Sequence, residues 1–249
     1  MMETKLEIKE HDPSKISKPN IIVGVPEAGL VGTISASYLI QQLKLPEAGY
    51  VDSELVPPVV VVHDSKPKRP IRIFGRDELV VIASEVPLNP RLSLEFAAEV
   101  ARWAKARNSK ILVGITSVPF ESRMENVEEG KVNVLALASE SRIEDMFKQI
   151  GASPFEEGVI VGTYAKLLQH CIDLGQPNLT LLAEAYPQFP DPGAAAAAIE
   201  VLNRVLPIQV DVGNLIKQAD EVRLRMRQLM ARTQENMKRM AETAPSVYG

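Results

Sequence analysis

The chain of 249 residues lacks several features that mark particular classes of protein. Its single cysteine, Cys171, excludes an intramolecular disulfide framework and is typical of a reducing compartment. No stretch reaches the roughly 18 consecutive apolar residues of a membrane span. The opening residues MMETKLEIKEHDPSK lack the apolar core of a signal peptide. We therefore expect a cytoplasmic protein with no membrane partner.

The chain also has fewer basic than acidic residues, 28 against 32. The net charge is −4, whereas a general nucleic-acid binder usually carries a basic patch, so no nucleic-acid partner is expected. Hydrophobic residues make up 45% of the chain and charged residues 24%, which is ordinary for a globular protein. The chain therefore has enough apolar material for a sizeable core.

Residues that commonly carry catalysis do not form a recognisable set. There is no Gly-x-Ser-x-Gly elbow. His11, His63 and His170 have no partner at metal-ligand spacing, so neither a metal nor a cofactor is predicted. Cys171 adjoins His170 on a predicted helix, where neighbouring side chains point in different directions, so it is interpreted as a small buried residue. The acidic stretch 121–130 is interpreted as a solvated loop.

One glycine-rich turn could still bind a ligand. Gly24, Gly29 and Gly32 follow a short apolar run, but their spacing does not match a dinucleotide fingerprint. Thr33-Ile34 stands where a Walker loop needs Lys-Ser/Thr, so that loop is excluded. A helix N-terminus at this turn could hold an anion through free N–H groups. The favoured interpretation is a tight turn that lets the helix pack closely on the strand.

Apolar runs alternate with amphipathic segments along the chain, a pattern typical of βαβ units. Short turns at 66–70 and 75–77 predict antiparallel connections within 59–83. The fold class predicted is therefore α/β, a three-layer α/β/α arrangement with a mixed, mostly parallel sheet. Strands are expected at 21–25, 59–62, 71–74, 79–83, 110–116, 132–139 and 178–186, and helices at 30–41, 91–107, 142–151 and 191–207, while 156–175 is expected to be a strand or turn running into a helix.

Glycine and proline are absent from 214–242, where the charge density rises. Apolar or small residues there step by 4, 3, 4, 3 and 4, which is the a/d spacing of a coiled coil. As a helix this stretch would span roughly 43 Å at about 1.5 Å per residue. A narrow stripe favours a helical partner, although a helix lying along the core is the alternative. The predicted seam consists of Leu215, Ala219, Val222, Met226, Leu229 and Thr233.

The last residues form a separate feature. Ala244-Pro245-Ser246 ends the helical pattern, and Val247, Tyr248 and Gly249 close the chain. An exposed valine and tyrosine at a terminus either fold back onto the core or enter a pocket of another protein. We therefore divide the chain into an α/β core at 1–211, a long C-terminal helix at 212–243 and a flexible tail at 244–249.

Three segments carry a resemblance to a known family: VPEAGLVGTISASYLIQQL, GVIVGTYAKLLQHCIDLG and LTLLAEAYPQFPDPGAAAAAIEVLNRVL. In order and approximate spacing, most of 20–206 resembles the proteasome assembly chaperone 2 family, specifically its archaeal members. The resemblance implies a phosphorylase/hydrolase-like mixed sheet. It also implies an ATP-independent chaperone or adaptor that is not an enzyme and that forms homo-oligomers, for which we expect a tetramer or pentamer.

The resemblance also assigns a role to the tail. Proteasome activators and assembly chaperones commonly end in a hydrophobic residue, a tyrosine and any residue, and this tail enters pockets between subunits of the proteasome α-ring. Val247, Tyr248 and Gly249 fit that pattern at the extreme C-terminus. The implied partners are therefore proteasome α-subunits or the 20S core particle.

Two other functions remain open at this point. The chain could be a small-molecule-binding enzyme of phosphorylase/hydrolase-like fold with an anion site near Gly29–Gly32, although a shared fold is weak evidence for activity. A pocket with convergent polar groups at these glycines would support that function, and a closed, packed turn would count against it. The third alternative is a scaffold whose coiled coil binds an unrelated helix.

Overall fold

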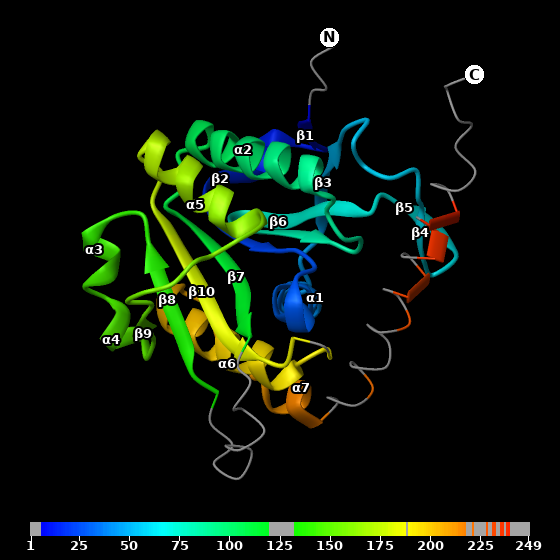
Figure 1. The fold of residues 1–249 in the computed structure, drawn as a ribbon. Helices are drawn as coiled ribbons and strands as arrows, with labels where there is room; N and C mark the ends of the chain where they lie inside the picture. The colour runs from blue at the N-terminus through cyan, green and yellow to red at the C-terminus, as the bar shows by residue number, and fades with distance from the viewer. Residues whose placement is uncertain are drawn as a thin grey trace, which may run out of the picture.

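The computed structural model describes residues 6–119, 132–187 and 189–217, together with positions 221, 228, 231–232, 235–236 and 238–239. An eight-stranded sheet forms the middle of the molecule in the order β1-β3-β6-β2-β7-β10-β8-β9 (Figure 1). Its strands are β1 (Glu7–Glu10), β2 (Ile16–Gly24), β3 (Glu47–Asp52), β6 (Ile71–Ser84), β7 (Ile111–Pro119), β8 (Val134–Ala138), β9 (Ser153–Pro154) and β10 (Asn178–Ala185).

The sheet is mixed and mostly parallel, as predicted. The ladders β2–β6, β2–β7, β7–β10 and β8–β9 are parallel. The ladders β1–β3, β3–β6 and β8–β10 are antiparallel. The central strands are buried on both faces because helices cover both sides, which is why they are continuous apolar runs in the sequence.

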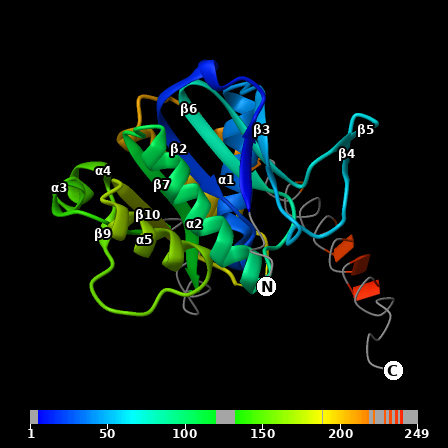
Figure 2. The same cartoon turned by 90° about the horizontal axis from the view of Figure 1, so that it is seen from above.

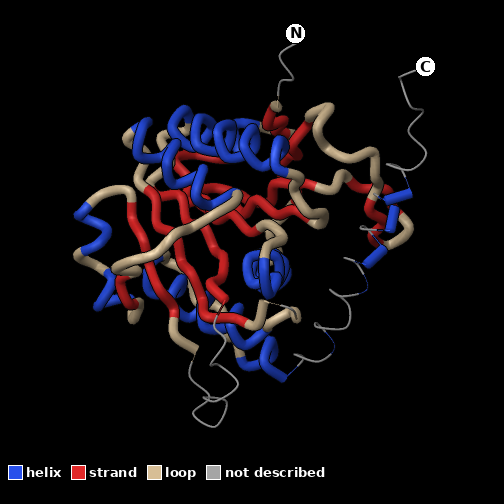
Figure 3. The backbone as a smooth tube through the Cα atoms, viewed as in Figure 1, coloured by secondary structure: helices blue, strands red, loops and turns tan. Residues whose placement is uncertain are grey.

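Helices form the two outer layers (Figures 1 and 3). The pair α1 (Val31–Gln42) and α6 (Pro192–Val205) packs on one face, and the pair α2 (Pro90–Ala106) and α5 (Thr163–Leu174) on the other. This confirms the predicted three-layer fold. The other helices in the described residues up to 217 are α3 (Ser141–Glu144), α4 (Phe147–Ile150), α7 (Gly213–Lys217) and the 3-10 turns η1 (Pro13–Lys15) and η2 (Ala28–Leu30). Within the described residues, no helix is long and apolar enough to cross a membrane.

Two helix starts show the local chemistry expected of their sequences. Asn89 and Asp191 precede prolines, and their side chains accept hydrogen bonds from the backbone N–H of Leu92 and Ala194, both at 2.9 Å. The single helix predicted at 142–151 is instead split into α3 and α4. Between them, Met146 N donates a hydrogen bond to Ile143 O, three residues earlier, which is the pattern of a 3-10 turn.

The stretch 71–83 was predicted to be two strands joined by a turn at 75–77. The structure has one element, β6, but Glu85 N donates to Pro70 O at 2.9 Å, although these residues would lie roughly 50 Å apart in a straight strand. The chain therefore reverses within β6, where Asp77 has φ 53°. Residues 72–74 pair antiparallel with β3, and residues 79–83 pair parallel with β2, so the predicted reversal is confirmed.

The neighbouring prediction is wrong in detail. The strand expected at 59–62 is β4 (Val61–His63), and the basic turn expected at 66–70 begins as a second strand, β5 (Lys66–Lys68), which pairs with β4 in a separate hairpin. The chain reverses earlier, at Asp64 and Ser65, which have φ 49° and 60°. Two successive residues with positive φ form a turn whose twist matches a two-residue hairpin.

Candidate functional site at the carboxyl edge of the sheet

In open α/β sheets, ligands bind beyond the carboxyl ends of the strands, where the strand order reverses. Here the connection from β2 through α1 leads to one side of β2, and the connection from β6 through α2 leads to β7 on its other side. The carboxyl ends of β2 and β7 are therefore the place to look for a small-ligand site. The side chain that lies there is Glu27.

Glu27 forms hydrogen bonds with two distant parts of the chain. One carboxylate oxygen accepts from the Thr116 hydroxyl at 2.7 Å, and the other accepts from the backbone N–H of Thr163, the first residue of α5, at 3.2 Å. Burial raises the pKa of Glu27 above its ordinary value of 4.5, and the hydrogen bonds from Thr116 and Thr163 act in the opposite direction. The protein's own carboxylate thus holds the position at the start of α5 that an external anion would take.

We expect Glu27→Gln to change the pH dependence of stability. Since the pKa of Glu27 is raised in the folded state, its stabilising contribution is complete below about pH 4.5 and is lost as the pH rises through the folded pKa. The glutamine variant should therefore gain stability relative to the natural chain as the pH rises above about 4.5. Urea unfolding at several pH values measures the difference in the free energy of unfolding between the two chains. A difference that does not change with pH would contradict the raised pKa of the buried Glu27 carboxyl.

Glu27→Ala serves as the contrasting variant. It leaves the Thr163 N–H and the Thr116 hydroxyl without this acceptor, so we expect a loss of about 1–3 kcal/mol below about pH 4.5 that becomes smaller as the pH rises.

The glycine-rich turn beside Glu27 is closed. A Cβ added at Gly32 would lie 2.3 Å from Ile115 O, and one added at Gly24 would lie 2.2 Å from Gly32 O. Gly29 has φ 66°, and its O accepts from Asp191 N at 2.9 Å. Backbone therefore packs directly on backbone here. This agrees with the tight-turn interpretation and counts against the anion site near Gly29–Gly32.

Tyr164 lies beneath this turn and is a structural residue. Its hydroxyl accepts from Val25 N at 3.0 Å and donates to Val23 O at 3.3 Å. A Cβ at Gly114 would lie 2.7 Å from its ring. Burial raises its pKa well above 10.0, so the phenol stays protonated. Glu27, Thr116, Thr163 and Tyr164 thus bond to one another and to the backbone, whereas the buried Thr33 hydroxyl on α1 has no hydrogen-bond partner in the described part of the chain.

Cys171 on α5 is fully buried, as predicted. Burial raises the pKa of its thiol to about 12, so almost no thiolate exists at neutral pH. We expect a colorimetric disulfide reagent to leave the folded protein unmodified over hours and to modify one thiol per chain once urea unfolds it. Rapid modification of the folded protein would show that this packing opens.

Two surface depressions lie away from Glu27. One, of about 210 Å³, lies between β8 and α6 and includes Val134 and Arg204. The other, of about 250 Å³, lies near the start of β2 and includes Asn20 and Ile208. Neither includes a residue of the Glu27 cluster, by which we mean Glu27, Thr116 and Thr163, so neither depression lies at this edge of the sheet.

Comparison with known proteins identifies the family. The model of the PAC2 family matches residues 21–230. The chain belongs to the PAC2 family. An uncharacterized protein of Methanocaldococcus jannaschii is 26% identical to this PAC2 chain over 243 residues, covering 97% of each.

Solved structures of Pyrococcus furiosus proteins share the PAC2 fold. PbaA, described as an archaeal homolog of proteasome-assembly chaperone, superposes with a TM-score of 0.82 at 26% identity, covering 93% of this chain and 100% of PbaA. PbaB, described as an archaeal proteasome activator, gives a TM-score of 0.75 at 20% identity, covering 91% and 99% of the two chains. The resemblance expected from the sequence is confirmed.

The predicted partner-binding residues of this PAC2 chain fall mainly outside the described part. Leu215 on α7 is 1% exposed and belongs to the core cluster around α1 and α6, so it anchors the start of the C-terminal segment. The positions described between 221 and 239 are helical and exposed, away from the core in Figures 1 and 2. The remaining predicted residues, Ala219, Val222, Met226, Leu229, Thr233, Val247, Tyr248 and Gly249, lie outside the described residues.

Proposed function

We propose that this PAC2 protein is a cytoplasmic, ATP-independent proteasome assembly chaperone or adaptor and not an enzyme. The observation that carries the proposal is the match to PbaA along almost the whole chain. The packing at the carboxyl edge of the sheet supports it, because Glu27 and the backbone at Gly32 occupy the place where a small substrate would bind.

We assign docking to the tail. Tyr248 offers a large apolar ring with a polar hydroxyl and loses little rotamer freedom on burial, and Val247 adds apolar area. The terminal carboxylate of Gly249 can pair with a lysine in a pocket between adjacent α-subunits. The break at Ala244-Pro245-Ser246 separates this tip from the helix before it, so the tip can reorient as it enters the pocket.

Several copies would make weak tails effective. We propose that the helix expected at 212–243 carries the tail beyond the core and that its seam, Ala219 to Thr233, contacts the same helix of other copies in a tetramer or pentamer. One tail that binds raises the effective concentration of the others at a ring of identical pockets. The buried Leu215 would fix the direction in which each helix leaves its core.

Ring assembly tests the function. Purified archaeal α-subunits would be mixed with the full chain, and ring formation followed by native electrophoresis. We expect faster or more complete ring formation with the full chain, a weaker effect from Tyr248→Ala, and an unchanged effect from the control Ser246→Ala. If none of these chains alters assembly while the full chain and Ser246→Ala bind finished particles, the protein is an adaptor of the mature particle and not an assembly chaperone.

A further inference from the structure

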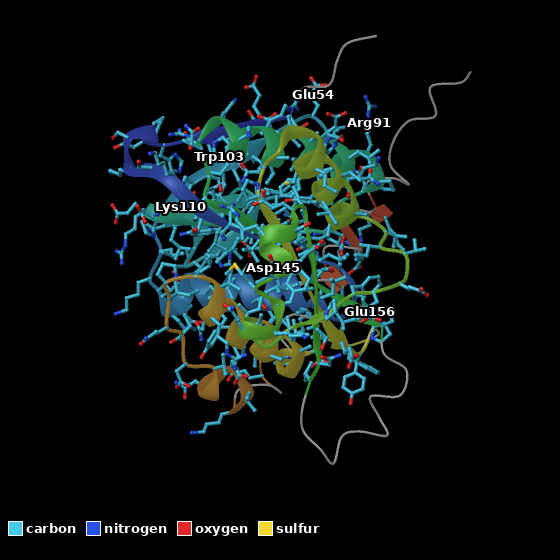
Figure 4. The ribbon with its side chains drawn as sticks, turned by 90° about the vertical axis from the view of Figure 1, so that its left-hand side faces the viewer. Glu54, Arg91, Trp103, Lys110, Asp145 and Glu156 are labelled. Atoms are coloured by element: carbon cyan, nitrogen blue, oxygen red, sulfur yellow. The ribbon has the colours of Figure 1, made fainter. Side chains whose placement is uncertain are left out.

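The depression of about 250 Å³ near the start of β2 has no part in the proposed function. Residues of β2 and β6, of the chain just after α1 and of the segment after α6 line it. It therefore lies at the amino edge of the sheet, at the other end of the strands from the Glu27 cluster. In Figure 4, Lys110, just before β7, marks the amino edge, and Arg91, at the start of α2, marks the carboxyl edge on the opposite side of the view.

Much of this lining is apolar. Leu45 is buried, and Leu43, Leu79 and Ile208 are half-buried against the core cluster around α1 and α6. Ligand sites in proteins are typically apolar hollows with a few polar groups that fix orientation. An apolar cavity of about 150 Å³ is large enough for benzene. The depression therefore has room for a molecule of one or two small rings.

Hydrogen bonds hold the two segments on either side of the depression in place. Leu45 N donates to Ile40 O at 3.0 Å, which fixes the chain as it leaves α1. The Asn203 side chain bonds to both backbone groups of Val210, donating to its C=O at 2.9 Å and accepting from its N–H at 3.0 Å. The shape of the depression therefore exists before any ligand binds, which lowers the cost of binding.

One polar side chain in this lining is almost completely buried. Asn20 is 6% exposed, and its Nδ2 donates to Glu78 O at 3.3 Å. Because a carbonyl oxygen can only accept, this bond fixes which end of the amide is the nitrogen. Asn20 Oδ1 has no partner in the described part of the chain, yet the Thr33 hydroxyl is the only fully buried side-chain group there without one. Asn20 Oδ1 therefore opens onto the depression, where it can accept a hydrogen bond from a bound molecule.

The charged side chains around the depression do not favour a ligand of either sign. Arg76 and Asp77 are both exposed and have opposite charges, and the exposed Glu78 pairs with Lys110. Lys44 is exposed beside two lining residues but does not line the depression itself. A charged group inside would meet a neutral amide as its buried partner, and burying an unpaired charge is costly. An uncharged molecule with a hydrogen-bond donor is therefore the better fit.

The surroundings favour a free molecule over a side chain of another protein, because a protein partner would also cover the rim. None of the large hydrophobic side chains exposed in the described part of the chain lines this depression. Its exposed side chains are mainly the charged Arg76, Asp77 and Glu78, and charged residues are depleted at the centres of protein interfaces.

We infer that the depression binds a small, uncharged aromatic molecule with one N–H or O–H group, whose ring packs on the apolar lining and whose donor bonds to Asn20 Oδ1. A flat ring offers apolar contact with few rotatable bonds to immobilise. The inference goes beyond the proposed function and does not depend on the tail. Because Ile208 belongs to the segment that leads into α7, a bound molecule would join α1 to the base of the C-terminal segment.

Two probes of nearly the same shape test the role of Asn20. Indole carries an N–H, whereas benzofuran has the same two rings with an oxygen in its place and cannot donate. In calorimetric titrations of the full chain, indole should bind about five to ten times more tightly than benzofuran, as one added hydrogen bond predicts. Asn20→Leu should bind both probes with equal affinity. The control Gln169→Leu, at an exposed position on α5, should keep the preference for indole.

Hydrogen exchange on the natural chain keeps the test independent of how well Asn20→Leu folds. Saturating indole should slow amide exchange at 43–45 and 207–210 and leave exchange at 27–33 unchanged. The inference is overturned if the natural chain does not bind indole, if it binds indole and benzofuran equally, if the preference survives in Asn20→Leu, or if indole protects other segments instead. Displacement of indole by a pentapeptide with a central tryptophan would overturn the assignment to a free molecule.

Discussion

Replacing Gly32 by alanine is expected to lower the free energy of unfolding by about 3 kcal/mol or more. The added Cβ would lie 2.3 Å from Ile115 O and 2.9 Å from the Tyr164 hydroxyl, and the first of these is backbone inside the sheet. It cannot move aside as a flexible side chain can, so α1 must shift away from β7. Urea denaturation monitored by circular dichroism measures the loss.

Gly213→Ala is the matched control for this experiment. A Cβ there would meet an Asp211 carboxylate oxygen at 3.2 Å, which is the end of a side chain that can rotate. We expect its stability to stay within about 0.5 kcal/mol of the natural chain. If Gly32→Ala behaves like this control, the close packing of α1 on the sheet is not what the glycine is needed for.

Deleting Val247 to Gly249 is expected to weaken binding to proteasome α-rings at least 100-fold. The effect should exceed that of one lost contact, because each tail in an oligomer raises the effective concentration of the others. A peptide of the last ten residues should bind far more weakly than the full chain, as one tail without its neighbours. Titration of assembled α-rings with the full chain, the deleted chain and the peptide measures all three.

The control for the tail is Ser246→Ala, which leaves the hydrophobic residue and the tyrosine in place and should bind as the natural chain does. Equal affinities for the peptide and the full chain would show that the tails act singly, and the multivalent part of the proposal would then be wrong.

The central strands could be predicted from the sequence because a strand that is buried on both faces is a continuous run of apolar residues. In β2, β7 and β10, apolar runs end at glycine, proline or a polar loop. The Asn-Pro and Asp-Pro pairs mark where the helices α2 and α6 begin. The outer strands β1 and β3 could not be predicted. Their sequences are short: EIKE has three charged residues in four, and EAGYVD begins and ends with a carboxylate and contains a glycine, so neither is an apolar run. They become strands by pairing with each other, and β3 also pairs with β6.

The Glu27 cluster was not predicted, because its partners are remote in the chain. Thr116 lies 89 residues from Glu27, and Thr163 lies 136 residues away. One local signal could have pointed to it. The residue before α5 is Gly162, which has no side chain to cap the helix, so the first N–H groups of α5 need an acceptor from elsewhere in the fold.

The measurement that tests the central claim most directly is native mass spectrometry of this chain with purified archaeal α-subunits, with and without Val247–Gly249. The account predicts complexes of the full chain with α-subunits at low micromolar concentration and their loss on truncation, with the truncated chain still folded. Complexes of equal abundance from both chains would show that the tail is not the docking element. Absence of complexes from both would contradict the proposed function.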